Sequence, residues 1–252
     1  KGNYIGIDKN GTTLITGSTQ DYGVYILASA ASNIIGGSVA GEGNVISANK
    51  SATGGCGIYT NSDAAAGNTI LGNIIGSQAD GVTYLASNLQ SIGISILNSP
   101  NNTIGGNTTG ARNIISANLG FGVYIAGASS TGNIVKGNYI GPSSSLLNIT
   151  GSNQDYGVYL ESSAANNTIG TAALGEANEI AFNTVNGVYL TDASTNGNLI
   201  SANPIYSNTG KPVELNYGVN QGNDGKAVPV ITSATATDVS GTSGMFDEIE
   251  IF

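Results

Sequence analysis

Tyrosine recurs at one position of an internal repeat, and a row of such side chains is suited to binding sugars. Each of these residues follows a glycine by two positions, and they are Tyr25, Tyr59, Tyr124, Tyr159 and Tyr189, with Ser95 at an equivalent position that lacks the ring. If successive repeats stack, the rings form a stripe that contacts a sugar through apolar faces and hydroxyl hydrogen bonds. The alternative is structural, because tyrosine favours strands and covers neighbouring backbone, and loops could fold over the rings.

Pairs of carboxyl groups are the second feature to test, because a glycosidase uses two of them about 5–9.5 Å apart. Asp21 and Asp155 occupy equivalent positions of the repeat, as do Glu42 and Glu176. The members of each pair lie several turns of the repeat apart, about 19 Å if turns are spaced like the strands of a sheet. The spacing therefore assigns no catalytic residue.

Cationic residues are the third feature, because a lyase needs a basic side chain beside a uronate and usually acidic residues that hold Ca²⁺. The chain has only 7 Lys and Arg residues and no His, and none of the cations recurs in a neighbouring turn of the repeat. The pattern predicts no set of metal ligands and no cofactor, apart from a Ca²⁺ ion held loosely by a single acidic loop. If the turns stack, the loops between their strands form two columns. The enzymatic alternative is a site assembled from both columns, with residues such as Asp80, Arg112 and Glu176.

Composition excludes two classes of partner. Only 9% of the residues are charged and the net charge is −9, so the chain lacks a phosphate-neutralising surface and we expect no nucleic acid partner. No apolar run reaches the length of a membrane span, so we expect no membrane insertion. Hydrophobic residues make up 40% of the chain and recur periodically, which is sufficient to build a core.

The elements that must position these side chains are repeated units. The Asn-Val-Ile-Ser-Ala-Asn segment at 44–49 returns in related form at 113–118 and 178–183, and Gly57, Gly122 and Gly187 recur at one interval. A fixed period indicates stacked units that cannot bury their apolar faces alone.

Each turn of the repeat divides into three short strands. The first begins in a Gly-Val-Tyr-Ile-like motif, and the other two begin at the asparagine of an Asn-x-Ile-like motif. Alternation along the strands places aliphatic residues on one face, with Thr60 as the exception, and no helical period fits the pattern. The asparagines share the parity of the aliphatic residues, so we expect them to point inward at corners, satisfy the backbone there and bond one another along the axis.

This pattern predicts an all-β fold, a parallel β-helix (solenoid) of about six three-stranded coils. We expect residues 1–208 to form the β-helix and residues 209–252 to form a turn-rich cap and the start of a following β domain, with strands near 228–236 and 245–252. The chain opens within a repeat and closes on an alternating strand without a partner, so we expect flanking domains of a longer parent chain.

Four motifs resemble the right-handed parallel β-helix repeats of large secreted bacterial proteins. They are Asn102-Thr103-Ile104-Gly105-Gly106, Arg112-Asn113-Ile114-Ile115-Ser116-Ala117-Asn118, Gly122-Val123-Tyr124-Ile125 and Gly137-Asn138-Tyr139-Ile140-Gly141. The resemblance covers residues 1–208 and implies a right-handed solenoid followed by a C-terminal β extension or cap. Pectate lyases, polygalacturonases, alginate epimerases and phage tailspikes share this fold. The long loops alternate between two places in successive coils, so two coils make one repeat, and this two-coil period is similar to that of multidomain surface and adhesin-like proteins.

The resemblance implies a location outside the cell or at the bacterial cell surface. Combined with the absence of a catalytic pattern in the sequence, it favours a rigid scaffold or adhesive module of a larger secreted or cell-surface protein. The expected partners are polysaccharide, other surface proteins and the flanking domains. The alternative is a polysaccharide lyase, glycoside hydrolase or epimerase that acts on an acidic polysaccharide, so the sequence does not decide whether the protein is an enzyme.

Overall fold

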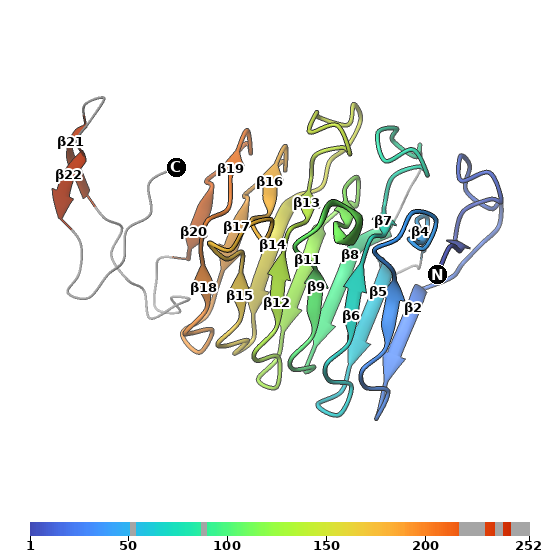
Figure 1. The fold of residues 1–252 in the computed structure, drawn as a ribbon, viewed down its shortest axis with the longest axis horizontal. Coiled ribbons are helices and arrows are strands. Elements are labelled where there is room, and N and C mark those ends of the chain that lie inside the picture. The colour runs from blue at the N-terminus through green and yellow to red at the C-terminus, as the bar shows by residue number, and fades with distance from the viewer. Residues whose placement is uncertain (51–53, 87–89, 217–229, 235–238, 243–252) are drawn as a thin grey trace.

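Three parallel β-sheets run along the molecule and alternate in the sequence, so that the chain winds in stacked coils (Figure 1). The computed structural model describes residues 1–50, 54–86, 90–216, 230–234 and 239–242. Each coil contributes one strand to each sheet, and neighbouring strands of these sheets are parallel. The protein is therefore an all-β parallel β-helix, as the sequence predicts.

The strands are short, and the longest belong to the first sheet. Sheet 1 contains β2 (Tyr22–Leu27), β5 (Gly55–Asn61), β8 (Gln90–Leu97), β11 (Phe121–Ala126), β14 (Tyr156–Glu161), β17 (Val188–Leu190) and β20 (Val213–Leu215). Sheet 2 contains β3 (Ile34–Gly36), β6 (Thr69–Leu71), β9 (Thr103–Gly105), β12 (Ile134–Lys136), β15 (Thr168–Ile169) and β18 (Leu199–Ile200). Sheet 3 contains β1 (Tyr4–Ile5), β4 (Val45–Ile46), β7 (Ile74–Ile75), β10 (Ile114–Ile115), β13 (Tyr139–Ile140), β16 (Glu179–Ala181) and β19 (Ile205–Tyr206).

Sheet 1 extends one strand further than the repeat motifs predict. β20 pairs in parallel with β17, with Val213 opposite Val188, although its segment lacks the Gly-x-Tyr motif. Farther along the chain, β21 (Val230–Ala234) and β22 (Val239–Thr242) form an antiparallel pair, and β21 lies in a segment where the sequence predicts a strand. The domain division after residue 208 stays a prediction, and the strand expected over 245–252 lies outside the described residues.

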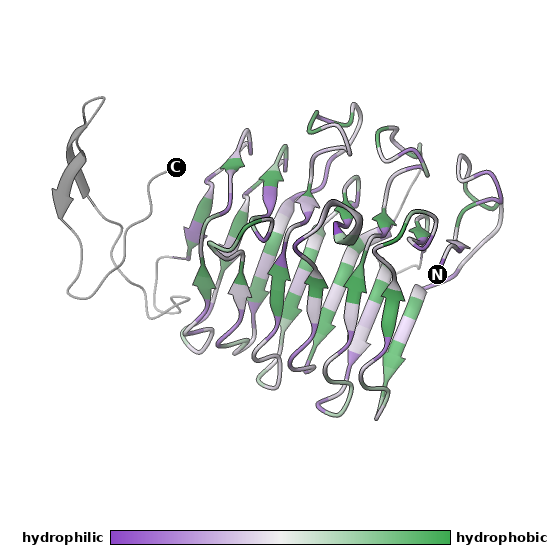
Figure 2. Ribbon diagram, viewed as in Figure 1, coloured by the Kyte–Doolittle hydropathy of each residue, from purple (hydrophilic) through white to green (hydrophobic). Residues whose placement is uncertain are grey.

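The interior is a stack of aliphatic side chains in register. In sheet 3, Ile75 pairs with both Ile46 and Ile115, and all three are fully buried. The inward residues of all three sheets belong to one core cluster, whereas Thr103, at an outward position, is only half-buried. Figure 2 shows hydrophobic residues alternating with residues of intermediate hydropathy along the longer strands. The predicted inward register is confirmed, and each buried aliphatic side chain contributes roughly 1.5–3 kcal/mol.

Side-chain amides form ladders along the corners of the coil, and two of these ladders consist of asparagine, as the sequence predicts. In both, Nδ2 of one asparagine donates to Oδ1 of the next at 2.8–3.0 Å. The ladder before sheet 2 contains Asn33, Asn68, Asn102, Asn133, Asn167 and Asn198. The ladder before sheet 3 contains Asn3, Asn44, Asn73, Asn113, Asn138, Asn178 and Asn203.

A third ladder lies before sheet 1. The sequence does not predict this ladder, because two of its members are glutamine and not asparagine. Its members are Asn49, Gln90, Asn118, Gln154, Asn183 and Asn208, and their amides are joined at 2.8–3.0 Å. The two glutamines follow long loops, so they do not lie in the recurring asparagine motifs. Both are fully buried.

The coil bends at residues in the left-handed conformation. In the corner before sheet 2, the residue that precedes each ladder asparagine has φ between 57° and 68°, and these residues are Ser32, Gly67, Asn101, Gly132, Asn166 and Gly197. Glycine and asparagine adopt this conformation most readily, which accounts for their recurrence at this corner.

Loops between the strands also stack on one another. The loops from sheet 3 to sheet 1, within residues 6–21, 76–86 and 141–155, are joined by hydrogen bonds from Ala79 N to Gly11 O (2.8 Å) and from Ser144 N to Gly81 O (2.9 Å). The first two loops bury Val45 on the outer face of sheet 3 in a second hydrophobic cluster. The loops from sheet 2 to sheet 3 form a second column, which includes the 3-10 helix η1 (Thr109–Ala111). In the part of the chain that the structure describes, no helix has the length and apolar character needed to cross a membrane.

Thr60 offers a test of the core packing. Its side chain lies in the interior between Ile26 and Ile96 in the strand pairing, and its hydroxyl has no hydrogen-bond partner among the described residues. Thr60→Val keeps the shape and removes the buried hydroxyl, so it should raise the free energy of unfolding by about 1 kcal/mol. Thr69→Val, at a half-buried outward position, is the control and should change stability by less than about 0.5 kcal/mol. Denaturant unfolding of both variants measures this, and equal effects would contradict the packing described.

Asn113 offers a test of the ladders. Its Nδ2 donates to Ile70 O and Asn138 Oδ1, and its Oδ1 accepts from the backbone and side-chain nitrogens of Asn73. Asn113→Ala leaves these buried groups without partners, so it should lower the free energy of unfolding by about 3 kcal/mol or more. Asn107→Ala, in an exposed loop, should have little effect in the same unfolding measurement. A stable Asn113→Ala protein would show that the ladder contributes little.

Candidate carbohydrate-binding surface

The five recurring tyrosines lie side by side on the outer face of sheet 1. Tyr25 pairs with Tyr59 across β2 and β5, and Tyr124, Tyr159 and Tyr189 pair in turn across β11, β14 and β17. The two groups are separated by the β8 coil, where Ser95 occupies the equivalent position. The strand pairing thus brings together the residues that the sequence singled out, although binding of a sugar by them stays a prediction.

A second row of rings, which the sequence analysis missed, precedes the first on the same strands. Tyr22, Phe121 and Tyr156 occupy this row, aligned through the strand pairing. Tyr22 is three residues before Tyr25, a separation that in a regular strand would place the two on opposite faces. Their ring centroids are nevertheless only 4.8 Å apart.

The intervening glycine explains this departure from alternation. A Cβ atom at Gly23 would lie 2.6 Å from the Cγ2 atom of Ile46 and 2.8 Å from Nδ2 of Asn49. The backbone at Gly23 is therefore pressed against the interior and the amide ladder, where no side chain fits. Gly23 and Val24 thus both face the interior, so Tyr22 before them and Tyr25 after them both project outward.

The rings of both rows touch one another and form what we call the aromatic surface. One part joins Tyr22, Tyr25 and Tyr59, with centroids 4.8–5.2 Å apart. The other part contains Phe121, Tyr124, Tyr156, Tyr159 and Tyr189, with centroids 4.8–6.0 Å apart. Such spacing is typical of favourable aromatic pairs.

The rings are covered to different degrees. Tyr22 and Tyr25 are 37% and 50% exposed, and the other rings of the aromatic surface are half-buried. No ring of the aromatic surface is fully buried by the loops, so the alternative that loops fold over the whole row does not describe this face. Between the two parts, Ser95 is almost fully buried.

Carboxylates and amides surround the tyrosine hydroxyls. Tyr124 Oη donates to Glu161 Oε1 at 2.5 Å, and Asn61 Nδ2 donates to Tyr59 Oη at 3.1 Å. Burial, reinforced by the Glu161 charge, raises the pKa of Tyr124 and of Tyr159 well above the ordinary value. The hydroxyls therefore stay protonated at neutral pH.

A second carboxylate lies at the β20 end of the aromatic surface. Glu214 pairs with Tyr189 in the strand register and accepts hydrogen bonds from Asn186 Nδ2 (2.7 Å) and Lys211 Nζ (2.6 Å). Neither Glu161 nor Glu214 has a role that the sequence predicts. Alternation along β14 does indicate that Glu161 faces outward, because it follows Tyr159 by two residues. The same reasoning does not apply to Glu214, because the segment of β20 lacks the repeat motif that marks the other strands.

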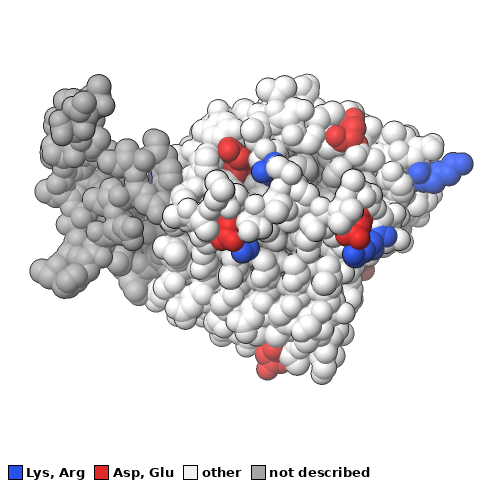
Figure 3. All heavy atoms as spheres, in the orientation of Figure 1, with Lys and Arg blue, Asp and Glu red and all other residues white. Residues whose placement is uncertain are grey.

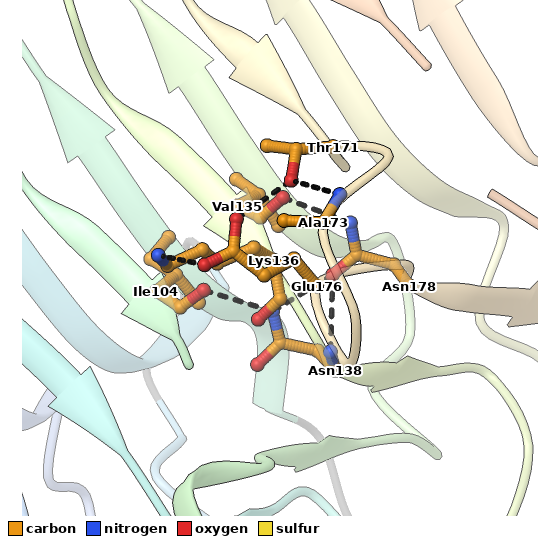
Figure 4. Close-up of polar contacts among 8 residues, drawn as sticks. All are labelled: Ile104, Val135, Lys136, Asn138, Thr171, Ala173, Glu176 and Asn178. Carbon is orange, nitrogen blue, oxygen red and sulfur yellow. Dashed lines mark hydrogen bonds and ion pairs between the residues drawn. The ribbon is translucent and has the colours of Figure 1, made fainter. Parts of the chain in front are cut away.

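The residues named for the enzymatic alternative each have contacts of their own. Asp80 holds its own turn by accepting from the backbone nitrogens of Val82 and Thr83, both at 2.9 Å. Glu176 is bound by Lys136 at 2.6 Å and by Thr171 at 2.6 Å (Figure 4). No hydrogen bond or ion pair joins Asp80, Arg112 and Glu176 to one another in the described part of the chain.

The Glu176 ion pair is instead part of the repeat. Lys1 and Glu42, at the equivalent positions, form the same pair at 2.8 Å, and the Lys136 ammonium holds the pKa of Glu176 below its ordinary value. Figure 4 shows this pair beside the ladder residues Asn138 and Asn178. Charged groups are sparse on the face drawn in Figure 3, with acidic and basic atoms side by side in several places. The recurring ion pairs with Lys1 and Lys136 indicate a structural role for Glu42 and Glu176.

Arg112 belongs to a separate cluster on the outer face of sheet 3. Its guanidinium lies over the Tyr139 ring, 4.1 Å from the centroid, and Tyr139 pairs with Glu179 in the strand register. Partial burial raises the pKa of Glu179, while hydrogen bonding to Tyr206 and the charge of Arg112 act against this rise. An acid and a cation thus meet here, although the sequence did not single out Glu179.

A shallow groove of about 350 Å³ lies on the same sheet between the two columns of loops. Its lining includes Val39, Val45, Ile74 and Ala79, and it contains no charged residue. The groove itself therefore has no group suited to acid–base chemistry.

Two further features bear on reactivity. Cys56 is buried, and desolvation raises the pKa of its thiol, so it is a poor nucleophile. In the described ranges, no group of three or more His, Cys, Asp and Glu residues lies close enough to hold a metal ion.

Comparison of the chain with protein-family models, with curated proteins and with solved structures gives no match.

Proposed function

We propose that this protein is a non-catalytic β-helical module that binds polysaccharide through the aromatic surface of sheet 1. The observation that carries the proposal is the continuous contact among rings from neighbouring coils, five of them in the larger part alone. Sugar rings pack their apolar faces on aromatic side chains, and the phenol hydroxyls add hydrogen bonds.

The shape of the surface favours a chain over a single sugar. The rings come from β2, β5, β11, β14 and β17, and neighbouring strands are about 4.8 Å apart. From β2 to β17, with β8 between the two parts, the surface therefore spans roughly 24 Å along the helix axis, which exceeds the size of one hexose. A polysaccharide lying along the axis can contact both parts of the surface.

Rigidity supports the same function. The backbone under the rings is fixed by strand pairing and by the amide ladder that runs before sheet 1. A preorganised surface loses little conformational entropy when a ligand binds. The proposal includes a scaffold or adhesive role in a larger protein outside a bacterial cell, where polysaccharide and other surface proteins are the partners.

The second candidate is an enzyme that acts on an acidic polysaccharide. The cluster of Arg112, Tyr139, Glu179 and Tyr206 is the observation that favours it, because a cation beside a partly buried acid could bind and protonate a uronate. No second carboxylate or free base completes the cluster among the described residues that act on Glu179. The aromatic surface is therefore the better-supported site.

Ring removal tests the binding proposal. Tyr124→Ala and Tyr159→Ala should each weaken polysaccharide binding at least about tenfold, since the loss of one stacked ring corresponds to about 1.4 kcal/mol. Affinity electrophoresis against a panel of neutral and acidic polysaccharides measures this, and thermal melting verifies that each variant folds.

Two further variants sharpen the result. Tyr124→Leu keeps a large apolar side chain at this position. If this variant also loses binding, the loss is due to the missing aromatic ring and not to a cavity. Tyr4→Ala, which removes a 48% exposed ring on sheet 3, should leave binding unchanged. Unaltered binding by all the sheet 1 variants would rule out the aromatic surface.

Product analysis separates the two candidates. We expect the purified protein to release no reducing ends and no unsaturated products from the same panel, with and without added Ca²⁺. Release at enzymatic rates that is abolished by Glu179→Gln, with folding intact, would replace the binding proposal by the enzymatic one.

A further inference from the structure

We infer that the aromatic surface selects sugar chains that carry no carboxylate, an inference that rests on the function proposed above. The groups that surround the rings carry it. The carboxylates among them accept hydrogen bonds and carry negative charge, whereas the alternative enzymatic function would require recognition of an acidic polysaccharide.

The Tyr124–Glu161 edge of the aromatic surface favours ligands that donate hydrogen bonds. Glu161, when ionised, can only accept hydrogen bonds, and it accepts one from the Tyr124 hydroxyl. Because its single O–H is used in this bond, the Tyr124 oxygen can only accept further hydrogen bonds. A ligand at this edge must bring donors, and the hydroxyl groups of uncharged sugars are donors, whereas an ionised uronate carboxylate is not.

Carboxylate charges beside the rings disfavour an acidic ligand. Asp21 acts electrostatically on Tyr22, Asp155 acts on Tyr156, and Glu214 acts on Tyr156 and on Tyr189. Together with Glu161, these carboxylates lie beside rings in both parts of the aromatic surface. A uronate chain brings one negative charge with each sugar and is repelled by Asp21, Asp155 and Glu161 over about 10 Å at 0.1 M salt, whereas the Glu214 charge is offset by Lys211.

Several of the cations of the chain are paired with carboxylates or lie on other faces. Lys211 acts on Tyr189, and its ammonium is bound to Glu214 at 2.6 Å. Lys1 and Lys136 form their ion pairs at the loops between sheets 2 and 3, and Arg112 lies over Tyr139 on sheet 3. Arg112 is the only arginine in the sequence, so the aromatic surface of sheet 1 has no guanidinium to bind a carboxylate through two parallel hydrogen bonds.

Matched oligosaccharides test the inference. The probes are hexamers of β-1,4-linked glucose and glucuronic acid and of α-1,4-linked galactose and galacturonic acid, so that members of a series differ only in the oxidation of C6. Titration calorimetry of the full chain should show the uncharged member binding at least tenfold more tightly than the uronate, and raising the salt to about 1 M should narrow the difference because the screening length falls to about 3 Å.

Charge removal identifies the residue responsible. Glu161→Gln should reduce the preference for the uncharged member at least threefold, whereas Glu42→Gln, which removes the same charge at the loops between sheets 2 and 3, should leave the preference unchanged. An equal effect of both variants, or none from Glu161→Gln, would overturn the assignment of selectivity to this edge.

The outcomes separate this inference from the proposed function. If a uronate hexamer binds as tightly as its uncharged counterpart and Tyr124→Ala abolishes that binding, the selectivity is wrong while polysaccharide binding stands. If none of the hexamers binds and no polysaccharide of the panel is retained, the proposed function fails and the selectivity fails with it.

Discussion

The structure depends on the hydrogen bond between side-chain amides of successive coils. A coil with three corners leaves backbone groups in the interior that no neighbouring strand can satisfy, and an unpaired buried polar group costs about 1–3 kcal/mol. Asn138 shows the solution, because its Nδ2 donates to Ile104 O, Lys136 O and Asn178 Oδ1 while its backbone nitrogen donates to the same Asn178 oxygen. One side chain thus satisfies backbone groups at its own corner and at the corner of the preceding coil. The amides consequently determine how each coil lies on the one before it.

This register has a consequence for the outer faces. When the interior residues superpose, the outward residues of the same strands superpose as well, so any side chain that recurs in the motif becomes a row along the axis. The tyrosines of sheet 1 form such a row because the Gly-x-Tyr motif recurs, and the Lys1–Glu42 and Lys136–Glu176 pairs recur for the same reason. A ligand that repeats along its own length is the natural complement of a surface built in this way.

The parts of the fold that the sequence could predict are those in which one residue type recurs at a fixed distance. The inward isoleucines and the asparagines of two ladders satisfy this condition, and the structure confirms both. Gln90 and Gln154 do not, because variable loops separate them from the preceding strand and because the longer side chain replaces asparagine without a change of role. The Lys136–Glu176 pair was missed for a related reason, since its partners come from different coils and only their pairing, not their individual spacing, reveals them.

The candidate site was predictable only in part, and the reason lies in the backbone. Tyr25, Tyr59, Tyr124, Tyr159 and Tyr189 were visible through the alternation of the strand, but Tyr22, Phe121 and Tyr156 project outward only because the following glycine interrupts that alternation where the chain presses against the amide ladder. The same close contact that secures the corner therefore doubles the width of the aromatic surface. A substitution at Gly23 would disturb the ladder and the rings together, and in this respect the interior of the β-helix and its candidate binding face are one structural unit.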